Sequence, residues 1–211
     1  MPAALARRTQ SERRATTRAA LLDAAVACLV ERGLAGTTTP AVCARAGLSQ
    51  GALFKHFPSK PALVGAAAAH LFDALTARYL DELARAARRA DRTEAAVRAL
   101  WAVFQRPELM TALELYLAAR NDAALAAALA PVMDRHARQL RELARRLFPE
   151  AAATPRFAAT LDLLLETLQG MALSHAIGPD PAHERRVLAL AVELARQAVA
   201  PVRRRTLEES A

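Results

Sequence analysis

The chain has 211 residues and a formal net charge of +8, and 54% of its residues are hydrophobic. This content predicts a packed core and excludes wholesale disorder, and the many alanines favour helix over strand. No run approaches the roughly 18 apolar residues of a membrane span, and no signal-peptide pattern follows the N-terminal arginines. Two cysteines, Cys28 and Cys43, are too few for a disulfide framework. We therefore expect a cytoplasmic protein without a membrane partner.

The basic charge is concentrated at the N-terminal end. Residues 1–60 contain nine Lys or Arg and three Asp or Glu, a net charge of +6, whereas the 20 basic and 18 acidic residues of 61–211 leave +2. A GC-rich genome that favours arginine over lysine would explain the arginines but not this asymmetry. The distribution is typical of a segment that binds nucleic acid.

Residues 1–14 read as a basic arm, which either reaches along a DNA groove or is a plain disordered tail. A helix is predicted from about Thr16 to Arg32, because apolar residues recur there at helical spacing, and Gly33 ends it. Neither cysteine has a cationic neighbour at a fixed spacing, so buried, unreactive thiols are favoured over redox sensors.

Between Thr37 and Lys60 the sequence predicts two short helices joined by a tight turn. The first is capped by Thr38 or Thr39 and ends at Gly47, where a residue of positive φ is needed. Ser49 caps the second helix and Pro58 stops it, with the apolar side chains Leu53, Phe54 and Phe57 expected in the core. A helix–turn–helix of this kind places its second helix in the major groove of DNA.

The segment from about Arg18 to Leu63 resembles the tetracycline-repressor (TetR) family of bacterial transcription regulators. The matching pieces are Leu22-Asp23-Ala24-Ala25, Glu31-Arg32-Gly33, Thr37-Thr38, Ala44-Arg45-Ala46-Gly47, Ser49, Gly51, Leu53 and His56-Phe57-Pro58-Ser59-Lys60. They cover about a quarter of the chain. The resemblance implies an all-α protein with a three-helix N-terminal DNA-binding domain and a helical C-terminal domain for ligand binding and dimerisation.

By this resemblance, the DNA-binding residues are Thr38, Thr39, Ser49, Gln50, Gly51, Ala52, Lys55, His56 and Lys60. Thr38 and Lys60 correspond to phosphate contacts, and Gln50 either reads an adenine edge or touches a phosphate. The family often has a basic residue where Gln50 stands and a tyrosine where Phe54 stands. Both differences remove groups that anchor the DNA backbone, so the contacts at these two positions are the ones that the resemblance leaves open.

The remainder of the chain reads as helices, without the two-residue alternation of strands. The expected ranges are Lys60 to about Arg88, Ala95–Phe104, Glu108 to about Asn121, Asp122–Leu129, Pro131–Leu147, Pro155 to about Ile177, and Ala182–Val199. Pro131 is expected to separate the fourth range from the fifth, because a proline removes a helical hydrogen bond.

The last two helices are candidates for a dimer interface, since the first of them is apolar on more than one side. The apolar residues along these two helices would fit a monomer core equally well. Because dimers of the family form through these helices, the resemblance favours a dimer interface. We predict as interface residues Leu161, Leu165, Leu168, Gly170, Ala172, Leu190 and Leu194.

The middle helices are expected to enclose an apolar pocket, as in the family, although ordinary core would show the same residues. We predict as ligand-binding residues Trp101, Phe104, Met110, Leu113, Glu114, Leu117, Met133 and His136. If Glu114 is buried there, it needs Arg120, His136 or a cationic ligand as its partner. The five histidines are scattered and no phosphate-binding glycine loop is present, so we predict neither a metal, a cofactor nor an enzyme.

We therefore predict a basic arm (1–14), a helix–turn–helix domain (15–60) and a helical ligand-binding and dimerisation domain (61–211). The expected function is that of a transcriptional regulator that binds a near-palindromic operator as a homodimer. By its resemblance to the family, whose members are usually repressors, we expect a repressor. A hydrophobic small-molecule effector would release it. The rivals are a sequestering protein with a vestigial DNA-binding head and an enzyme on a helical bundle, for which no catalytic residues are found.

Overall fold

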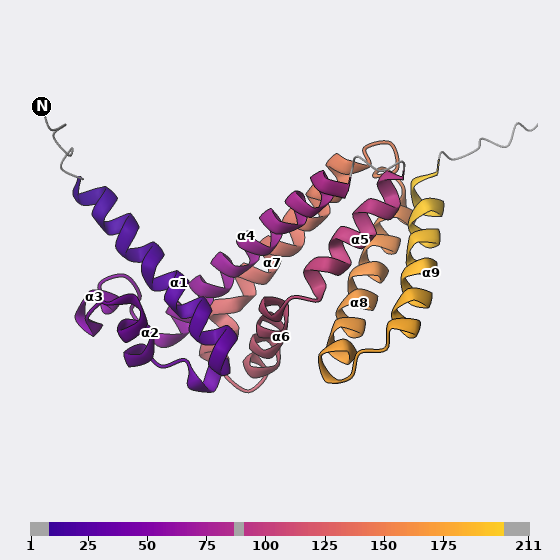
Figure 1. The fold of residues 1–211 in the computed structure, drawn as a ribbon. Coiled ribbons are helices and arrows are strands. Elements are labelled where there is room, and N and C mark those ends of the chain that lie inside the picture. Colours follow the sequence, from indigo (N-terminus) through magenta and orange to yellow (C-terminus); the bar gives the residue numbers. More distant parts are fainter. Residues whose placement is uncertain (1–8, 87–90, 201–211) are drawn as a thin grey trace, which may run out of the picture. The chain divides into compact units, whose positions relative to one another are not determined.

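A computed structural model describes residues 9–86 and 91–200, and within these ranges all regular structure is helical (Figure 1). The helices are α1 (Gln10–Gly36), α2 (Thr39–Ala46), α3 (Gln50–Phe54), α4 (Lys60–Ala86), α5 (Arg92–Phe104), α6 (Pro107–Ala119), α7 (Ala123–Leu147), α8 (Pro155–Ile177) and α9 (Pro181–Val199). The all-α prediction is confirmed. None of the helices in the described ranges is both long and apolar enough to cross a membrane.

Helix α1 begins earlier than expected. The Thr9 hydroxyl accepts the N–H of Glu12, and the Glu12 carboxylate accepts the N–H of Thr9, which forms a capping box. Residues 10–14, which were expected to belong to the arm, are therefore helical, and only 1–8 of the predicted arm lie outside the described residues.

Helix α7 is continuous where two helices were expected. It runs through Pro131, which is exposed, as is Ala127, whose carbonyl loses its helical partner. Because that carbonyl can reach water, the proline does not have to end the helix. Burial of Leu125 and Leu129, at 3% and 0% exposure, supports the helix on either side of Ala127.

The described residues form two compact units, and two helices contribute to both. The first unit contains the chain up to Leu75 together with Pro107–His136, and the second contains Thr76–Arg106 and the chain from Ala137 onwards. Thus α4 and α7 each have their first part in the first unit and their second part in the second. The expected domain boundary after residue 60 follows the motif, whereas the first compact unit also includes α6 and the first parts of α4 and α7.

In the first unit, α1, α2 and α3 form a small head around Leu21, Leu29, Val42 and Leu53, which are all 0–1% exposed. Glycine allows α4 and α7 to approach closely, because a Cβ atom on Gly65 would lie 2.9 Å from the carbonyl oxygen of Ala128. The core of this unit is therefore closed by contacts between backbones as well as side chains.

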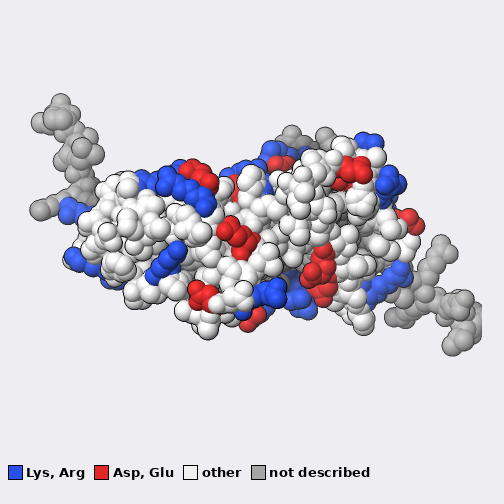
Figure 2. Space-filling view, turned by 90° about the horizontal axis from the view of Figure 1, so that it is seen from below, with Lys and Arg blue, Asp and Glu red and all other residues white. Residues whose placement is uncertain are grey.

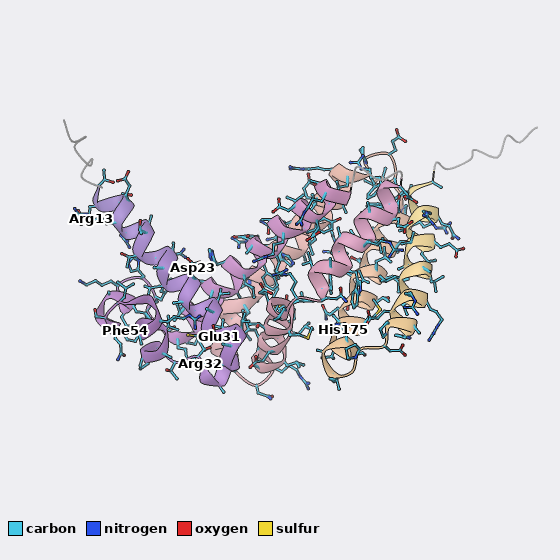
Figure 3. All side chains as sticks on the ribbon, viewed as in Figure 1. Arg13, Asp23, Glu31, Arg32, Phe54 and His175 are labelled. Carbon is cyan, nitrogen blue, oxygen red and sulfur yellow. The ribbon has the colours of Figure 1, made fainter. Side chains whose placement is uncertain are left out.

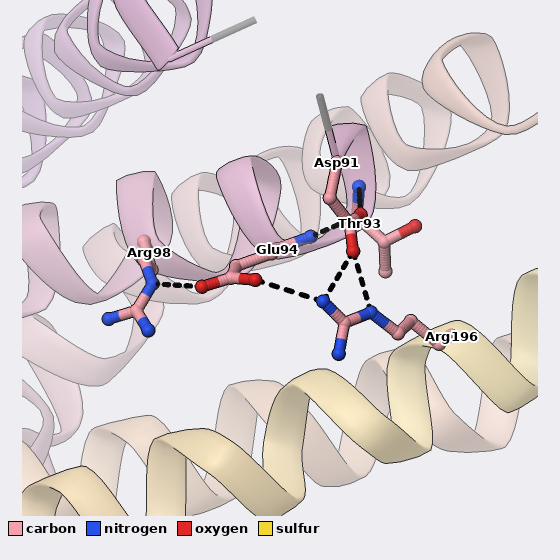
Figure 4. Close-up of polar contacts among 5 residues, drawn as sticks. All are labelled: Asp91, Thr93, Glu94, Arg98 and Arg196. Atoms are coloured by element: carbon pink, nitrogen blue, oxygen red, sulfur yellow. Dashed lines mark hydrogen bonds and ion pairs between the residues drawn. The ribbon is translucent and has the colours of Figure 1, made fainter. Parts of the chain in front are cut away.

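In the second unit, α5, α8 and α9 pack against one another. Arg196 on α9 donates to Asp91 (2.6 Å) and Glu94 (2.9 Å) at the start of α5, and Glu94 also accepts from Arg98 (Figure 4). Asp91 caps α5 by accepting the N–H groups of Thr93 and Glu94. These hydrogen bonds hold the pKa of Asp91 below its usual value, first through the backbone N–H of Glu94 and then through Arg196.

Candidate nucleic-acid interface

The turn between α2 and α3 follows the chemistry of its residues. Thr38 caps α2 by accepting the N–H of Ala41, and Gly47 ends α2 with φ 66° and ψ 33°, in the left-handed region. Ser49 then caps α3 by accepting the N–H of Ala52 at 3.1 Å. Two helices are thereby joined by three residues, in the arrangement expected of a helix–turn–helix.

The start of α3 is open to solvent. Ser49, Gln50, Gly51 and Lys55 are exposed, and Ala52 is half-buried. A Cβ atom on Gly51 would meet only the Ser49 hydroxyl, at 3.9 Å, so the backbone here can be approached closely. Lys55 makes no ion pair with any residue that the structure describes, which leaves its charge available to a phosphate.

Phe54 differs from the prediction, because it does not point into the core. Its exposed fraction is 47%, whereas Leu53 and Phe57 are 0% and 3% exposed. Phe54 is labelled on α3 in Figure 3. Leu53 and Phe57 are four residues apart and share one helical face, and Phe54 is turned away from that face. This spacing was the signal in the sequence that could have assigned Phe54 to the surface beside Gln50 and Lys55.

The basic residues of the head have different surroundings. Arg45 on α2 donates twice to Glu31 on α1, both at 2.6 Å, and the hydrogen bond lowers the pKa of Glu31. Arg18 lies over the ring of Phe57, 5.3 Å from its centre. Arg45 and Arg18 therefore stabilise the head itself. Figure 2 shows Lys and Arg side chains spread over the surface at its left end, where the head lies.

Both cysteines are buried in the head, Cys28 at 1% and Cys43 at 4% exposure. Burial raises the pKa of the Cys43 thiol, so this thiol stays protonated at neutral pH. The expectation of buried thiols is confirmed.

The kink at Gly33, near the end of α1, is held by two other helices of the first unit. Gly33 has φ 66° and ψ −178° and interrupts the helical backbone, so that the N–H of Leu34 is free to donate to the Glu114 carboxylate of α6, at 2.7 Å. The ammonium group of Lys60 lies 3.4 Å from the carbonyl oxygen of Leu34. Glu114 and Lys60 therefore both fix the segment that leads into α2.

The predicted DNA-binding residues are brought together on the head, in the first unit. Thr38, Ser49, Gln50, Gly51 and Lys55 are exposed, and Thr39, Ala52, His56 and Lys60 are half-buried. Lys60 differs from the other basic candidate because its ammonium already meets a backbone carbonyl.

The predicted ligand-binding residues are divided between the two units. Trp101 and Phe104 belong to the second unit, and the other six belong to the first. The Glu114 side chain is exposed and accepts the N–H of Leu34, so it is not the buried carboxylate that would need a cation. Leu117 is 60% exposed.

A cavity of about 80 Å³ lies in the second unit, among α5, α8, α9 and the second parts of α4 and α7. None of the eight predicted ligand-binding residues lines it. Its walls include Tyr79, Thr93, Phe148, Thr160 and Leu164. Sequence reasoning missed these residues, because nothing local in the sequence shows which faces of five separate helices meet.

The predicted interface residues of α8 and α9 differ in exposure. Leu168 and Ala172 are 0% and 2% exposed within the protomer, so a partner subunit would not contact their side chains. Leu161 and Leu165 line the cavity. Gly170 is exposed and Leu190 is 56% exposed, and large apolar side chains outside the predicted set are also exposed on α8, namely Leu163, Leu173 and Ile177.

Comparison with known proteins identifies the head. Residues 21–67, from within α1 to the first turns of α4, match the family model of bacterial regulatory proteins of the tetR family. The HTH-type transcriptional regulator Rv2912c of Mycobacterium tuberculosis is 28% identical over 176 residues, which cover 82% of this chain and 90% of that protein. The HTH-type transcriptional regulator CymR of Pseudomonas putida is 28% identical over 199 residues, 94% of this chain and 98% of CymR.

Residues 21–67 therefore form a TetR-type DNA-binding domain, and over most of its length the chain is similar to HTH-type transcriptional regulators. Its fold agrees with the crystal structure of the multidrug binding protein EbrR complexed with ethidium, with a TM-score of 0.64 at 24% identity over 84% of this chain and 98% of EbrR. The family match contains all of α2 and α3, so the exposed residues at the start of α3 belong to a DNA-binding helix–turn–helix.

Proposed function

We propose that this TetR-family regulator is a repressor that binds a near-palindromic operator as a homodimer and acts by binding, not by catalysis. One observation carries the proposal: Ser49, Gln50, Gly51 and Lys55 are exposed at α3, while Leu53 fixes that helix in the core of the head. The early residues of such a helix lie near base edges in the major groove, and a dimer spaces its two half-sites about 34–36 Å apart.

Each exposed group suits a different part of DNA. The Gln50 amide can donate to and accept from an adenine edge, and the methyl group of Ala52 suits a thymine methyl. Gly51 permits close approach of the backbone. Thr38 and Lys55 suit phosphates, Thr38 at the N-terminus of α2, where free N–H groups attract an anion, and Lys55 through its unpaired charge.

The dimer interface that we infer lies on α8 and α9, on the apolar side chains that the protomer leaves exposed. Leu163, Leu173 and Ile177 on α8 are 53%, 50% and 86% exposed, and Leu190 on α9 is 56% exposed. Exposed apolar residues at helical spacing mark a surface that binds another protein. Gly170 lies on the same side of α8 as Leu163 and Leu173. A Cβ atom added to Gly170 would meet nothing within 4 Å, so this position offers room for a second helix.

We infer that the effector binds the cavity of the second unit and that two helices connect this cavity with the head. Tyr79 on α4 lines the cavity, and the same helix begins at Lys60, whose ammonium meets Leu34. Leu140, in the second part of α7, also lines it. EbrR shares the fold and binds ethidium, but at 24% identity this supports a common architecture and not a common ligand. The effector acts by its different affinity for the DNA-binding and released states.

The proposal is tested by selecting bound sequences from random duplex DNA with the purified protein at two salt concentrations. Enrichment of an inverted repeat is expected. The variant Lys55→Ala should weaken operator binding, and Arg145→Ala, which removes one exposed positive charge from α7, is the matched control and should not. Binding that ignores sequence at both salt concentrations, for protein shown to be free of bound small molecules, would reject the proposal.

A further inference from the structure

The walls of the cavity in the second unit are mainly apolar. Fifteen of its eighteen lining residues are Ala, Val, Leu or Phe, and the other three are Tyr79, Thr93 and Thr160. Its volume of about 80 Å³ exceeds several-fold the roughly 10–15 Å³ that a single water requires. The space is therefore large enough for part of an organic molecule, and its surface favours apolar groups.

Among residues 9–86 and 91–200, no charged side chain lines the cavity. The charged groups closest in sequence to Thr93 are Asp91 and Glu94, and both are already bound by Arg196, with Arg98 as a second partner of Glu94 (Figure 4). Both oxygens of Asp91 are in use, because the second one caps α5. A ligand charge would therefore enter an apolar space without a partner, which is strongly unfavourable.

Three hydroxyl groups provide the polar part of the walls. The hydroxyls of Tyr79, Thr93 and Thr160 make no hydrogen bond to any residue in the described part of the chain. Tyr79 is 8% exposed, and burial raises its pKa to about 12, so its phenol is an uncharged donor at neutral pH. A donor in the cavity wall without a partner among the described residues favours a ligand that brings an acceptor oxygen.

We propose that this cavity binds an uncharged, mainly apolar small molecule with one acceptor oxygen, which Tyr79 hydrogen-bonds. The inference rests on the proposed function, since it names the chemical class of the effector for the same cavity. It also separates this protein from EbrR, because ethidium is a permanent cation and the cavity-lining residues that the structure describes include no group to pair with one.

The test uses two fluorescent probes of nearly equal shape. N-phenyl-1-naphthylamine is uncharged, and 1-anilinonaphthalene-8-sulfonate has the same ring system with an added sulfonate. The uncharged probe should bind at least about tenfold more tightly, because the sulfonate would lie against apolar walls whose described residues offer its charge no partner. Equal affinity, or tighter binding of the sulfonate, would overturn the proposal.

Two variants locate the binding site. Ala144→Phe places a ring in the cavity and should weaken binding of the uncharged probe about tenfold or more, whereas Ala102→Phe makes the same change at an exposed position of α5 and should not. Circular dichroism verifies that both variants fold. If Ala144→Phe does not fold, Leu161→Phe replaces it, and unchanged probe binding in a folded cavity variant overturns the assignment.

The acceptor oxygen is tested with Tyr79→Phe, which keeps the ring and removes the donor. 2-Acetonaphthone, with a carbonyl, and 2-isopropylnaphthalene, without one, compete for the uncharged probe. The wild type should prefer the ketone roughly three- to tenfold, and Tyr79→Phe should lose this preference. A preference that survives the substitution would remove Tyr79 from the site. Operator binding, measured separately on the same variants, reports on the head alone, so failure of the cavity inference and failure of DNA recognition give different results.

Discussion

Substitution of Gly33 by alanine tests the contact between the backbone at the end of α1 and Glu114 of α6. Gly33 has φ 66° and ψ −178°, a backbone region that is essentially restricted to glycine. An alanine Cβ at this position would lie 2.8 Å from Oε1 of Glu114, the oxygen that accepts the Leu34 N–H at 2.7 Å. The substitution therefore both strains the backbone and displaces a carboxylate from its hydrogen bond.

The expected loss of unfolding free energy follows from these two effects. The backbone conformation alone costs about 1–3 kcal/mol, and loss of an exposed hydrogen bond to a charged acceptor adds about 1 kcal/mol. We expect Gly33→Ala to destabilise the protein by about 2–4 kcal/mol. Gly47→Ala is the matched control, because Gly47 also has φ 66° but nothing lies within 4 Å of its Cβ position, and about 1–2 kcal/mol is expected there.

The assay is urea unfolding followed by circular dichroism, with the free energy taken from linear extrapolation. The variant Glu114→Ala separates the two effects. In the double variant Gly33→Ala/Glu114→Ala the collision is absent, so its cost should be smaller than the sum of the single costs by about 1 kcal/mol. Additive costs, or a Gly33→Ala cost no greater than that of Gly47→Ala, would refute the contact between Glu114 and the turn.

Three further predictions concern single side chains. Lys60→Ala should reduce the dependence of log affinity for DNA on log salt by about one unit if Lys60 leaves Leu34 for a phosphate, and an unchanged slope would keep it a structural residue. Phe54→Ala should weaken operator binding while changing the free energy of unfolding by less than about 0.5 kcal/mol, since Phe54 is exposed; a larger loss in urea unfolding would place it in the core. Burial lowers the pKa of His136 below 6.5, so the unfolded chain takes up the proton first and stability should fall as the pH drops below about 6.5, a dependence that urea unfolding of His136→Phe should lack.

Local signals predicted much of the fold. Helix α8 has the expected bounds, because Thr154 caps it, Pro155 occupies its first turn and Gly178 follows its last residue. Where local signals competed with packing, the prediction was wrong. Pro131 was expected to end a helix, but its solvent-facing position and the buried leucines before it allow α7 to continue.

The candidate DNA site was predictable because its residues are consecutive in the sequence. Thr38, Gly47 and Ser49 have roles that their chemistry dictates within a few residues. Contacts between distant residues were not predictable in this way. Glu114 is 80 residues from Leu34, and nothing in the sequence around it distinguishes a carboxylate that accepts a backbone N–H from one in a ligand pocket.

Because the chain alternates between the two units, the DNA-binding head and its supports do not form one continuous segment. The backbone passes from one unit to the other three times, after Leu75, Arg106 and His136. A fragment that ends at residue 60 or 75 would contain the helix–turn–helix but not α6, and its turn at Leu34 would lack the Glu114 carboxylate. The DNA-reading part of this regulator therefore cannot be excised at one cut or exchanged with that of a relative by a single crossover while all its supports are kept. A chimera that retains them must take residues 107–136 from the same parent as the head.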